Sequence, residues 1–296
     1  MSKVMVGLIG GTGLGEALSK EVQGQSRHVD TPYGAPSAEI VLGQWEGVDI
    51  AFIPRHGPGH VLSPTAVPYR ANIYALKAVG VTHIIASGAT GSLREEIRAR
   101  DLVVVDQVID KTTQRASTFF DEPGIAAHVE FSEPFCPHLR RILLRAANSQ
   151  KVTVHDGGTY VCMEGPAFST VAESRMHRSW GGDLIGMTCM PEAKLAREAE
   201  MCYALVALPT DYDCWRPHDP NLDKRALLKE ILHNVAEATT RSVTLIRAAL
   251  RGIAEGVSSD CSCRTALDAA VWTSRDRLVS EVKNRLGPIV SRLLNP

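Results

Sequence analysis

Two carboxylates stand two residues apart in the segment Thr210-Asp211-Tyr212-Asp213, shortly after the apolar run Ala204–Leu208. Charged side chains at the end of a buried strand are costly unless they are paired, hydrated or used chemically. Three kinds of site use such a pair: a Mg²⁺ site with oxygen ligands, the acid–base pair of a glycosidase, and a polar clamp on a heterocyclic base and its proton. The sequence shows no matching His or carboxylate cluster that would complete a metal shell.

A second group of residues is suited to an anion. Arg55-His56-Gly57 follows the apolar run Asp49–Pro54; Arg binds phosphate oxygens through two N–H groups at once, and His adds a third donor. In Gly10–Leu14, glycines allow backbone N–H groups to approach an anion and Thr12 adds a hydroxyl, although the loop matches neither the dinucleotide nor the Walker A pattern. The small polar segment Ser87–Ser92 supplies further donors. Each of these segments is also consistent with an ordinary turn.

A third group could hold a flat ring. Met163–Ser169 (MEGPAFS) places Phe168 beside a Gly-Pro turn, and Met187-Thr188 follows another apolar run. Aromatic rings and thioethers pack well against flat heterocycles, although each of these residues alone is more typical of a core.

Short runs rich in Val and Ile alternate with amphipathic segments, which predicts an α/β fold whose strands are covered on both faces. The predicted strands are Val4–Ile9, Asp49–Pro54, Thr82–Ala86, Leu102–Ile109, Gly158–Met163, Asp183–Thr188 and Ala204–Leu208. The predicted helices are Pro68–Val79, Phe135–Ala147, Ser169–Trp180, Glu192–Cys202, Leu227–Leu250 and, interrupted near Gly287-Pro288, Ala266–Leu294. Ligands of open α/β sheets bind beyond the carboxyl ends of the strands, and nearly all the residues above fall in those loops.

The chain has 296 residues, of which 44% are apolar and 22% charged. This composition is typical of a globular protein. We predict one catalytic domain over residues 1–250 and a helical extension over residues 251–296 that packs on the same domain. The segment that most resembles a linker is Arg251–Asp260.

Lys plus Arg (32) nearly equals Asp plus Glu (33), a net charge of −1 that argues against broad binding to nucleic acid or anionic membranes. There is no apolar run long enough to cross a membrane. The short N-terminal apolar run ends in glycines, so we expect a strand there and not a signal peptide. The expected location is the cytoplasm.

Seven cysteines are scattered along the chain, and only Cys261 and Cys263 form a C-x-C. One C-x-C without a second Cys/His pair nearby is a weak metal signal, so we expect reduced thiols and no metal.

Ten motifs in a fixed order carry a family resemblance. They are G-G-T-G-L (10–14), D-T-P-Y-G-A-P-S (30–37), A-F-I-P-R-H-G (51–57), A-N-I-Y-A-L-K (71–77), G-S-L-R-E-E-I (91–97), D-Q-V-I-D-K-T-T (106–113), E-P-F-C-P (133–137), E-G-P-A-F-S (164–169), M-T-C-M-P-E (187–192) and T-D-Y-D-C-W (210–215). From about residue 4 to about residue 250, the chain resembles the methylthioadenosine phosphorylases within the trimeric purine nucleoside phosphorylase family.

The resemblance implies a single α/β domain with a mixed central sheet flanked by helices. It also implies phosphorolysis of methylthioadenosine in purine and methionine salvage, a homotrimer or dimer of trimers, and no metal or organic cofactor. The residues that match the family's phosphate-binding positions are Thr12, Arg55, His56 and Ala89. Those that match its base and ribose positions are Phe168, Ser169, Met187 and Thr188. Asp211 and Asp213 match the catalytic positions that recognise the purine N7 and 6-amino group, and His128 matches a residue lent by the neighbouring subunit.

The chain departs from the family at Gly88, where a Thr that contacts phosphate and ribose is usual. Leucines in the stretch Leu222–Leu227 favour an apolar pocket for a 5′ thioether. The alternatives are a purine nucleoside or methylthioinosine phosphorylase, a non-catalytic nucleotide-binding module, and a metal-dependent nucleosidase.

Overall fold

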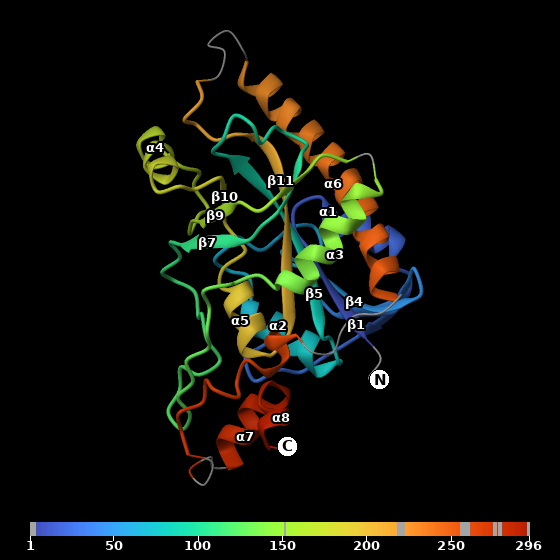
Figure 1. Cartoon of the computed structure of the whole chain (residues 1–296), viewed down its shortest axis with the longest axis vertical. Coiled ribbons are helices and arrows are strands. Elements are labelled where there is room, and N and C mark those ends of the chain that lie inside the picture. The colour runs from blue at the N-terminus through green and yellow to red at the C-terminus, as the bar shows by residue number, and fades with distance from the viewer. Residues whose placement is uncertain are drawn as a thin grey trace.

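The computed structural model describes residues 4–150, 152–217, 223–254, 261–274, 277 and 280–294. Within these residues an eleven-stranded mixed sheet carries helices on both faces (Figure 1), which confirms the predicted α/β class with a mixed central sheet. No helix among the described residues is both long and apolar enough to cross a membrane.

Four parallel strands form the middle of the sheet in the order β4, β1, β5 and β11. Their bounds are β1 Met5–Gly10, β4 Val48–Pro54, β5 His83–Ser92 and β11 Cys202–Tyr212. The outer strands are β2 Gly24–Arg27, β3 Ile40–Trp45, β6 Leu102–Val104, β7 Gln107–Asp110, β8 Val154–Asp156, β9 Thr159–Cys162 and β10 Leu184–Gly186. The middle strands are apolar almost throughout because both of their faces are covered.

Side chains of one strand alternate between two cores. Leu8 of β1 lies in the core with α1, α3 and α6, whereas its neighbour Ile9 lies in the core with α2 and α5. The helices of the first core are α1 Leu14–Glu21, α3 Pro137–Asn148 and α6 Lys224–Ala254. Those of the second are α2 Tyr69–Ala78 and α5 Glu192–Glu198, and a further helix, α4, spans Val171–Ser179.

The C-terminal extension is helical only in part. Its described elements are η1 Ser262–Thr265, α7 Ser280–Leu286, η3 Gly287–Ile289 and α8 Ser291–Leu294. The predicted helix over Ala266–Leu294 is therefore wrong over the described residues 266–274, whereas its break at Gly287-Pro288 is confirmed. Leu286 and Ile289 join the core that includes α2, so this part of the chain packs against α2 (Figure 1).

Two predicted loops are the ends of strands. Ser87–Ser92 continues β5, and Thr210-Asp211-Tyr212 continues β11, because these two strands pair with each other beyond their apolar parts. The predicted strand Leu102–Ile109 is two strands on different partners, since β6 pairs with β8 and β11 whereas β7 pairs with β9.

The short and largely polar elements β2 and β8, the strand β3 that lies between β2 and β4, and helix α1 were not predicted. Of the predicted linker Arg251–Asp260, the part up to Ala254 belongs to α6 and the rest lies outside the described residues.

Candidate active site

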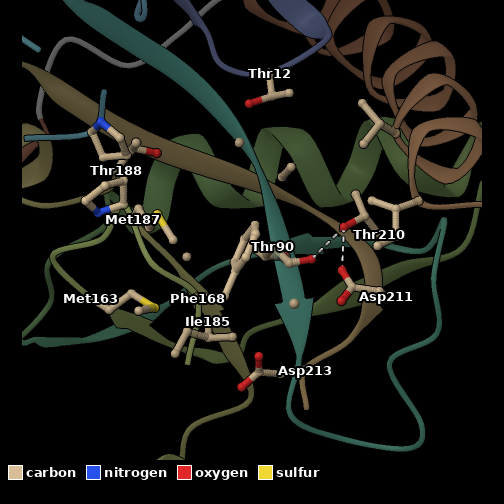
Figure 2. Close-up of a pocket in the computed structure, with 18 of the residues that line it drawn as sticks. Thr12, Thr90, Met163, Phe168, Ile185, Met187, Thr188, Thr210, Asp211 and Asp213 are labelled. Atoms are coloured by element: carbon tan, nitrogen blue, oxygen red, sulfur yellow. Dashed lines mark hydrogen bonds between the residues drawn. The ribbon is translucent and has the colours of Figure 1, made fainter. Parts of the chain in front are cut away.

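A cavity of about 530 Å³ lies at the carboxyl ends of the middle strands (Figure 2). Its size suits a small organic molecule. Every predicted site residue except His128 lines it, namely Thr12, Arg55, His56, Ala89, Phe168, Ser169, Met187, Thr188, Asp211 and Asp213. Thr12 and Asp213 lie at opposite ends of the group of side chains drawn in Figure 2.

A bulge at the end of β11 positions Asp211. Pro209 pairs with Thr90 and Asp211 with Gly91, so Thr210 is the extra residue between them. A bulge of this kind turns the side chains that follow it. The Thr210 hydroxyl donates to Asp211 Oδ1 at 2.7 Å, and Asn234 of α6 donates to the Thr210 carbonyl at 2.8 Å, so the bulge is held from both sides.

Asp213 offers an open acceptor. Its backbone N–H donates to the Ser92 carbonyl, which fixes the residue beside the end of β5. Its Oδ2 atom is buried and has no hydrogen-bond partner among the described residues. A buried carboxylate oxygen without a donor is costly. A ligand N–H group in the cavity would supply the missing donor.

Arg55 is fully buried at the other end of the cavity. Glu192 of α5 accepts from its Nε and Nη2 atoms, both at 2.8 Å, and the Ser87 carbonyl accepts from Nη1 at 2.7 Å. Burial alone would lower the pKa of Arg55, but Glu192 raises it above its ordinary value, so the guanidinium stays charged. Three of the five N–H groups of the guanidinium are thus used, and the other two have no acceptor among the described residues.

His56 is a neutral ring with a fixed tautomer. Burial, followed by the neighbouring Arg55, lowers the pKa of His56 to about 4. Because its Nδ1 lies 2.8 Å from the Leu62 carbonyl, which can only accept, the ring proton is on Nδ1. His56 Nε2 is then an acceptor. In this neutral form the ring would meet an anion as an acceptor of a P–OH group, and the role of His56 at the phosphate stays a prediction.

The neutral His56 makes stability depend on pH. An unfolded chain protonates His near pH 6.5, whereas the folded chain protonates His56 near pH 4. Between these values the unfolded state holds more protons, so the contribution of His56 to stability falls as the pH drops from about 6.5 to about 4. We expect the His56→Asn variant, which lacks this group, to gain in free energy of unfolding relative to wild type as the pH falls through that range. Urea denaturation at several pH values measures the difference, and a difference independent of pH would contradict this prediction.

Phe168 and two methionines provide an apolar wall. Phe168 is 86% exposed although it lines the cavity, and Met163 and Met187 lie on the same side of the view in Figure 2. An exposed aromatic side chain at a cavity is able to cover one face of a flat ring.

Arg115 holds the two loops that form this wall. It donates to Glu164 Oε1 at 2.9 Å, to the Glu164 carbonyl at 2.6 Å and to the Met187 carbonyl at 2.5 Å. Burial raises the pKa of Glu164, but hydrogen bonds from Thr113 N–H, Thr65 and Arg115 outweigh it and lower the pKa to about 2. Glu164 does not line the cavity, so its carboxylate serves to position the loop.

Several contributors to the site were not predicted. Glu192 and Arg115 lie far from their partners in sequence, so no local pattern marks them. The apolar lining from α6 consists of Ile231, Leu232 and Val235. The predicted stretch was Leu222–Leu227; Leu222 lies outside the described residues, and Leu227 does not line the cavity. Residues 231, 232 and 235 have the spacing of one helical face, and this apolar face of α6 could have indicated the lining from the sequence.

His128 lies outside this cavity. It is exposed, and its ring makes a T-shaped contact with Trp272 at a centroid distance of 5.5 Å. Its backbone N–H donates to the Ala270 carbonyl, so the extension fixes its position.

A model of the phosphorylase superfamily matches residues 5–251 of this chain. The chain belongs to this superfamily. The S-methyl-5′-thioadenosine phosphorylase of Geobacter sulfurreducens is 48% identical over 287 residues, which cover 97% of this chain and 98% of that protein. The resemblance inferred from the ten motifs is thereby confirmed.

Solved structures of the superfamily agree. A methylthioadenosine phosphorylase sourced from an antarctic soil metagenomic library has a TM-score of 0.87 and 43% identity, covering 98% of this chain and 99% of that chain. A mutant of the adenosine/methylthioadenosine phosphorylase from Schistosoma mansoni, in complex with methylthioadenosine, has a TM-score of 0.80 and 35% identity, covering 90% of this chain and 96% of that chain. The chain is therefore an enzyme of the phosphorylase superfamily, and its cavity is the candidate active site.

Proposed function

We propose that the protein catalyses the phosphorolysis of S-methyl-5′-thioadenosine, which gives adenine and 5-methylthioribose 1-phosphate. The bond from ribose C1′ to purine N9 breaks, and an oxygen of inorganic phosphate forms the new bond to C1′. The observation that carries the proposal is one cavity that has anion-binding groups at one end and two carboxylates at the other.

At the phosphate end, positioning and charge compensation are the main requirements. The two free N–H groups of Arg55, the Thr12 hydroxyl and the Ala89 backbone N–H would donate to phosphate oxygens. The His56 Nε2 atom would accept a hydrogen bond from the P–OH group of monohydrogen phosphate, because the Nδ1–H of the same ring donates to the Leu62 carbonyl. Donors that are already in place stabilise the anion without reorganisation during the reaction.

At the base end, negative charge develops on the purine as the C1′–N9 bond breaks. Asp211 would share a proton with N7, and a positioned proton donor of this kind is typically worth about 10²–10⁴-fold in rate. The open acceptor Asp213 Oδ2 suits the N–H of a 6-amino group. A 6-oxo group would place acceptor against acceptor, so we propose a preference for 6-aminopurines.

At the 5′ end, the apolar side chains of Ile231, Leu232 and Val235 suit a methylthio group better than a hydroxyl. This lining favours methylthioadenosine over adenosine as the substrate. The reaction would serve purine and methionine salvage.

Gly88 leaves space for the hydroxyl that the family usually carries there. A Cβ atom at Gly88 would lie 3.4 Å from Thr188 Oγ1 and 3.8 Å from Arg55 Nη1, which are ordinary contacts. We expect Gly88→Ser to fold normally and to lower the KM for phosphate by roughly 2- to 12-fold, since one hydrogen bond contributes about 0.5–1.5 kcal/mol.

Gly11→Ala is the contrasting variant for Gly88→Ser, because it should change the KM for phosphate in the opposite direction. A Cβ atom at Gly11 would come within 2.6 Å of the Ser87 carbonyl and 2.7 Å of Arg55 Nη1, so this variant should raise the KM for phosphate. Steady-state kinetics at varied phosphate measure both. A raised KM in Gly88→Ser would contradict the proposed place of the phosphate.

The direct test of the proposed function is methylthioadenosine turnover with and without phosphate. We expect adenine release that requires phosphate and yields one sugar phosphate per adenine. Release without phosphate would indicate a nucleosidase, and binding without turnover of any nucleoside would indicate a nucleotide-binding module. A faster reaction of inosine or methylthioinosine would favour the other phosphorylase specificities.

We further propose a homotrimer, or a dimer of trimers, in which His128 reaches the neighbouring subunit's site. Its exposure, together with the backbone hydrogen bond to Ala270, supports this role. Residues 1–250 would form the catalytic unit and residues 251–296 its helical extension.

The reaction needs no organic cofactor, because phosphate is the co-substrate. All seven cysteines are free, which suits the reducing cytoplasm.

A further inference from the structure

Four cysteines from three distant parts of the chain converge away from the active site. Cys136 caps the N-terminus of α3, Cys202 begins β11, and Cys261 and Cys263 lie at η1 in the C-terminal extension. Their four Sγ atoms all lie within 4.8 Å of one another, and Cys136 Sγ is 3.4 Å from Cys261 Sγ. Three of the four side chains are buried and Cys261 is half-buried. We call Cys136, Cys202, Cys261 and Cys263 the thiol cluster.

The spacing of the thiol cluster is that of a tetrahedral metal site. Zinc–sulfur bonds of about 2.3 Å in a tetrahedron place the sulfurs roughly 3.8 Å apart. All four sulfurs lie in one group and not in two separated pairs. Soft thiolates select thiophilic ions such as Zn²⁺ and Fe²⁺.

We propose that the thiol cluster binds a thiophilic divalent transition-metal ion, with Zn²⁺ as the preferred ion. On binding, four thiols lose their protons to solvent and four metal–sulfur bonds form, with no change of oxidation state. The protein fills all four positions and leaves none for water or substrate, so the site is structural and not catalytic.

Neighbouring groups suit the net negative charge of a four-thiolate site. The Leu139 backbone N–H donates to Cys136 Sγ at 3.4 Å. His83 of β5 is the sheet partner of Cys202, and its Nε2 atom is buried without a partner among the described residues. The Nε2 atom of His138, in the first turn of α3, is likewise buried without one. An N–H donor to sulfur, such as that of Leu139, is a usual part of the surroundings of a metal site, and the two unpartnered ring nitrogens lie on residues next to cluster members in the sheet and in the chain.

The ion would fasten the C-terminal extension to the sheet. Cys202 and Asp211 lie at opposite ends of β11, roughly 30 Å apart at the rise of a strand, so the ion would not take part in the chemistry of the cavity. It would join η1 to the starts of α3 and β11. The extension in turn holds the segment before His128 through the bridge between Ala127 and Val271.

The sequence led us to expect no metal, because the C-x-C at 261–263 lacks a second pair nearby. The fold supplies that pair from Cys136 and Cys202. The sequence spacing of the four cysteines does not indicate the cluster, because only the tertiary structure brings them together.

The test is the metal content of the full-length protein, purified in the presence of a reductant and loaded with Zn²⁺. We expect about one zinc ion per chain after gel filtration. The double variant C261S/C263S should fall to background, whereas the control C214S, outside the cluster, should retain the ion. Cobalt loading should give the sulfur-to-metal charge-transfer absorption of a tetrahedral thiolate site in wild type and C214S only.

A second measurement uses the wild-type protein, so that it does not depend on whether the double variant folds. Removal of the ion from the wild-type protein should lower Tm, and added Zn²⁺ should restore it. Iron bound with the same dependence on Cys261 and Cys263 would support the site. A loaded protein without metal, whose four thiols react freely, would overturn the proposal. So would two disulfides in the reduced preparation, detected as a mass deficit before alkylation.

Discussion

Replacement of Asp211 by Asn should lower kcat/KM for methylthioadenosine by about 10²–10⁴-fold, because an amide cannot share a proton with the departing base. The side chain keeps its size, and the Thr210 hydroxyl can donate to the amide oxygen, so the bulge of β11 should survive. Steady-state kinetics with saturating phosphate measure the loss. Asp121→Asn, an exposed site that pairs with Arg70, is the matched control and should keep wild-type rates.

Asp213→Asn tests specificity. This variant should narrow the gap in kcat/KM between methylthioadenosine and methylthioinosine, because an amide facing the 6-position can donate to an oxygen as well as accept from an amine. An unchanged ratio of the two kcat/KM values would contradict the assignment of Asp213 to the 6-amino group.

Replacement of Arg55 by Met should lower the free energy of unfolding by about 3–5 kcal/mol, since it leaves the buried carboxylate of Glu192 without its counter-charge. Tyr203 would still donate to Glu192 Oε1 at 2.7 Å, but one neutral donor does not replace a guanidinium. Urea denaturation measures the change, and phosphate saturation of the rate measures the loss of the anion site.

A double variant separates these two roles of Arg55. Arg55→Met/Glu192→Leu removes both buried charges and should regain most of the lost stability, because a well-packed apolar pair often replaces a buried ion pair at little cost. It should not regain phosphate binding. A stable double variant with the wild-type KM for phosphate would show that Arg55 is structural only.

The position of the cavity could be expected from the sequence. Arg55, His56, Asp211 and Asp213 follow apolar runs, and the rule that ligands bind at the carboxyl ends of strands brings them together. All four side chains line one cavity.

What the sequence missed depends on pairing between distant segments. The bulge at Thr210 exists only because β11 pairs with β5 beyond its apolar part. Glu192 fixes the Arg55 guanidinium across 137 residues of sequence, and Cys136 meets Cys261 across 125. Local periodicity carries no information on such contacts.

The most direct test of the central claim is a crystal structure of the protein with adenine and sulfate bound together. We expect sulfate within hydrogen-bond distance of Arg55 and the backbone of Ala89, and the N7 atom and 6-amino group of adenine facing Asp211 and Asp213. Adenine or sulfate bound elsewhere, with these side chains left without a ligand, would contradict the account.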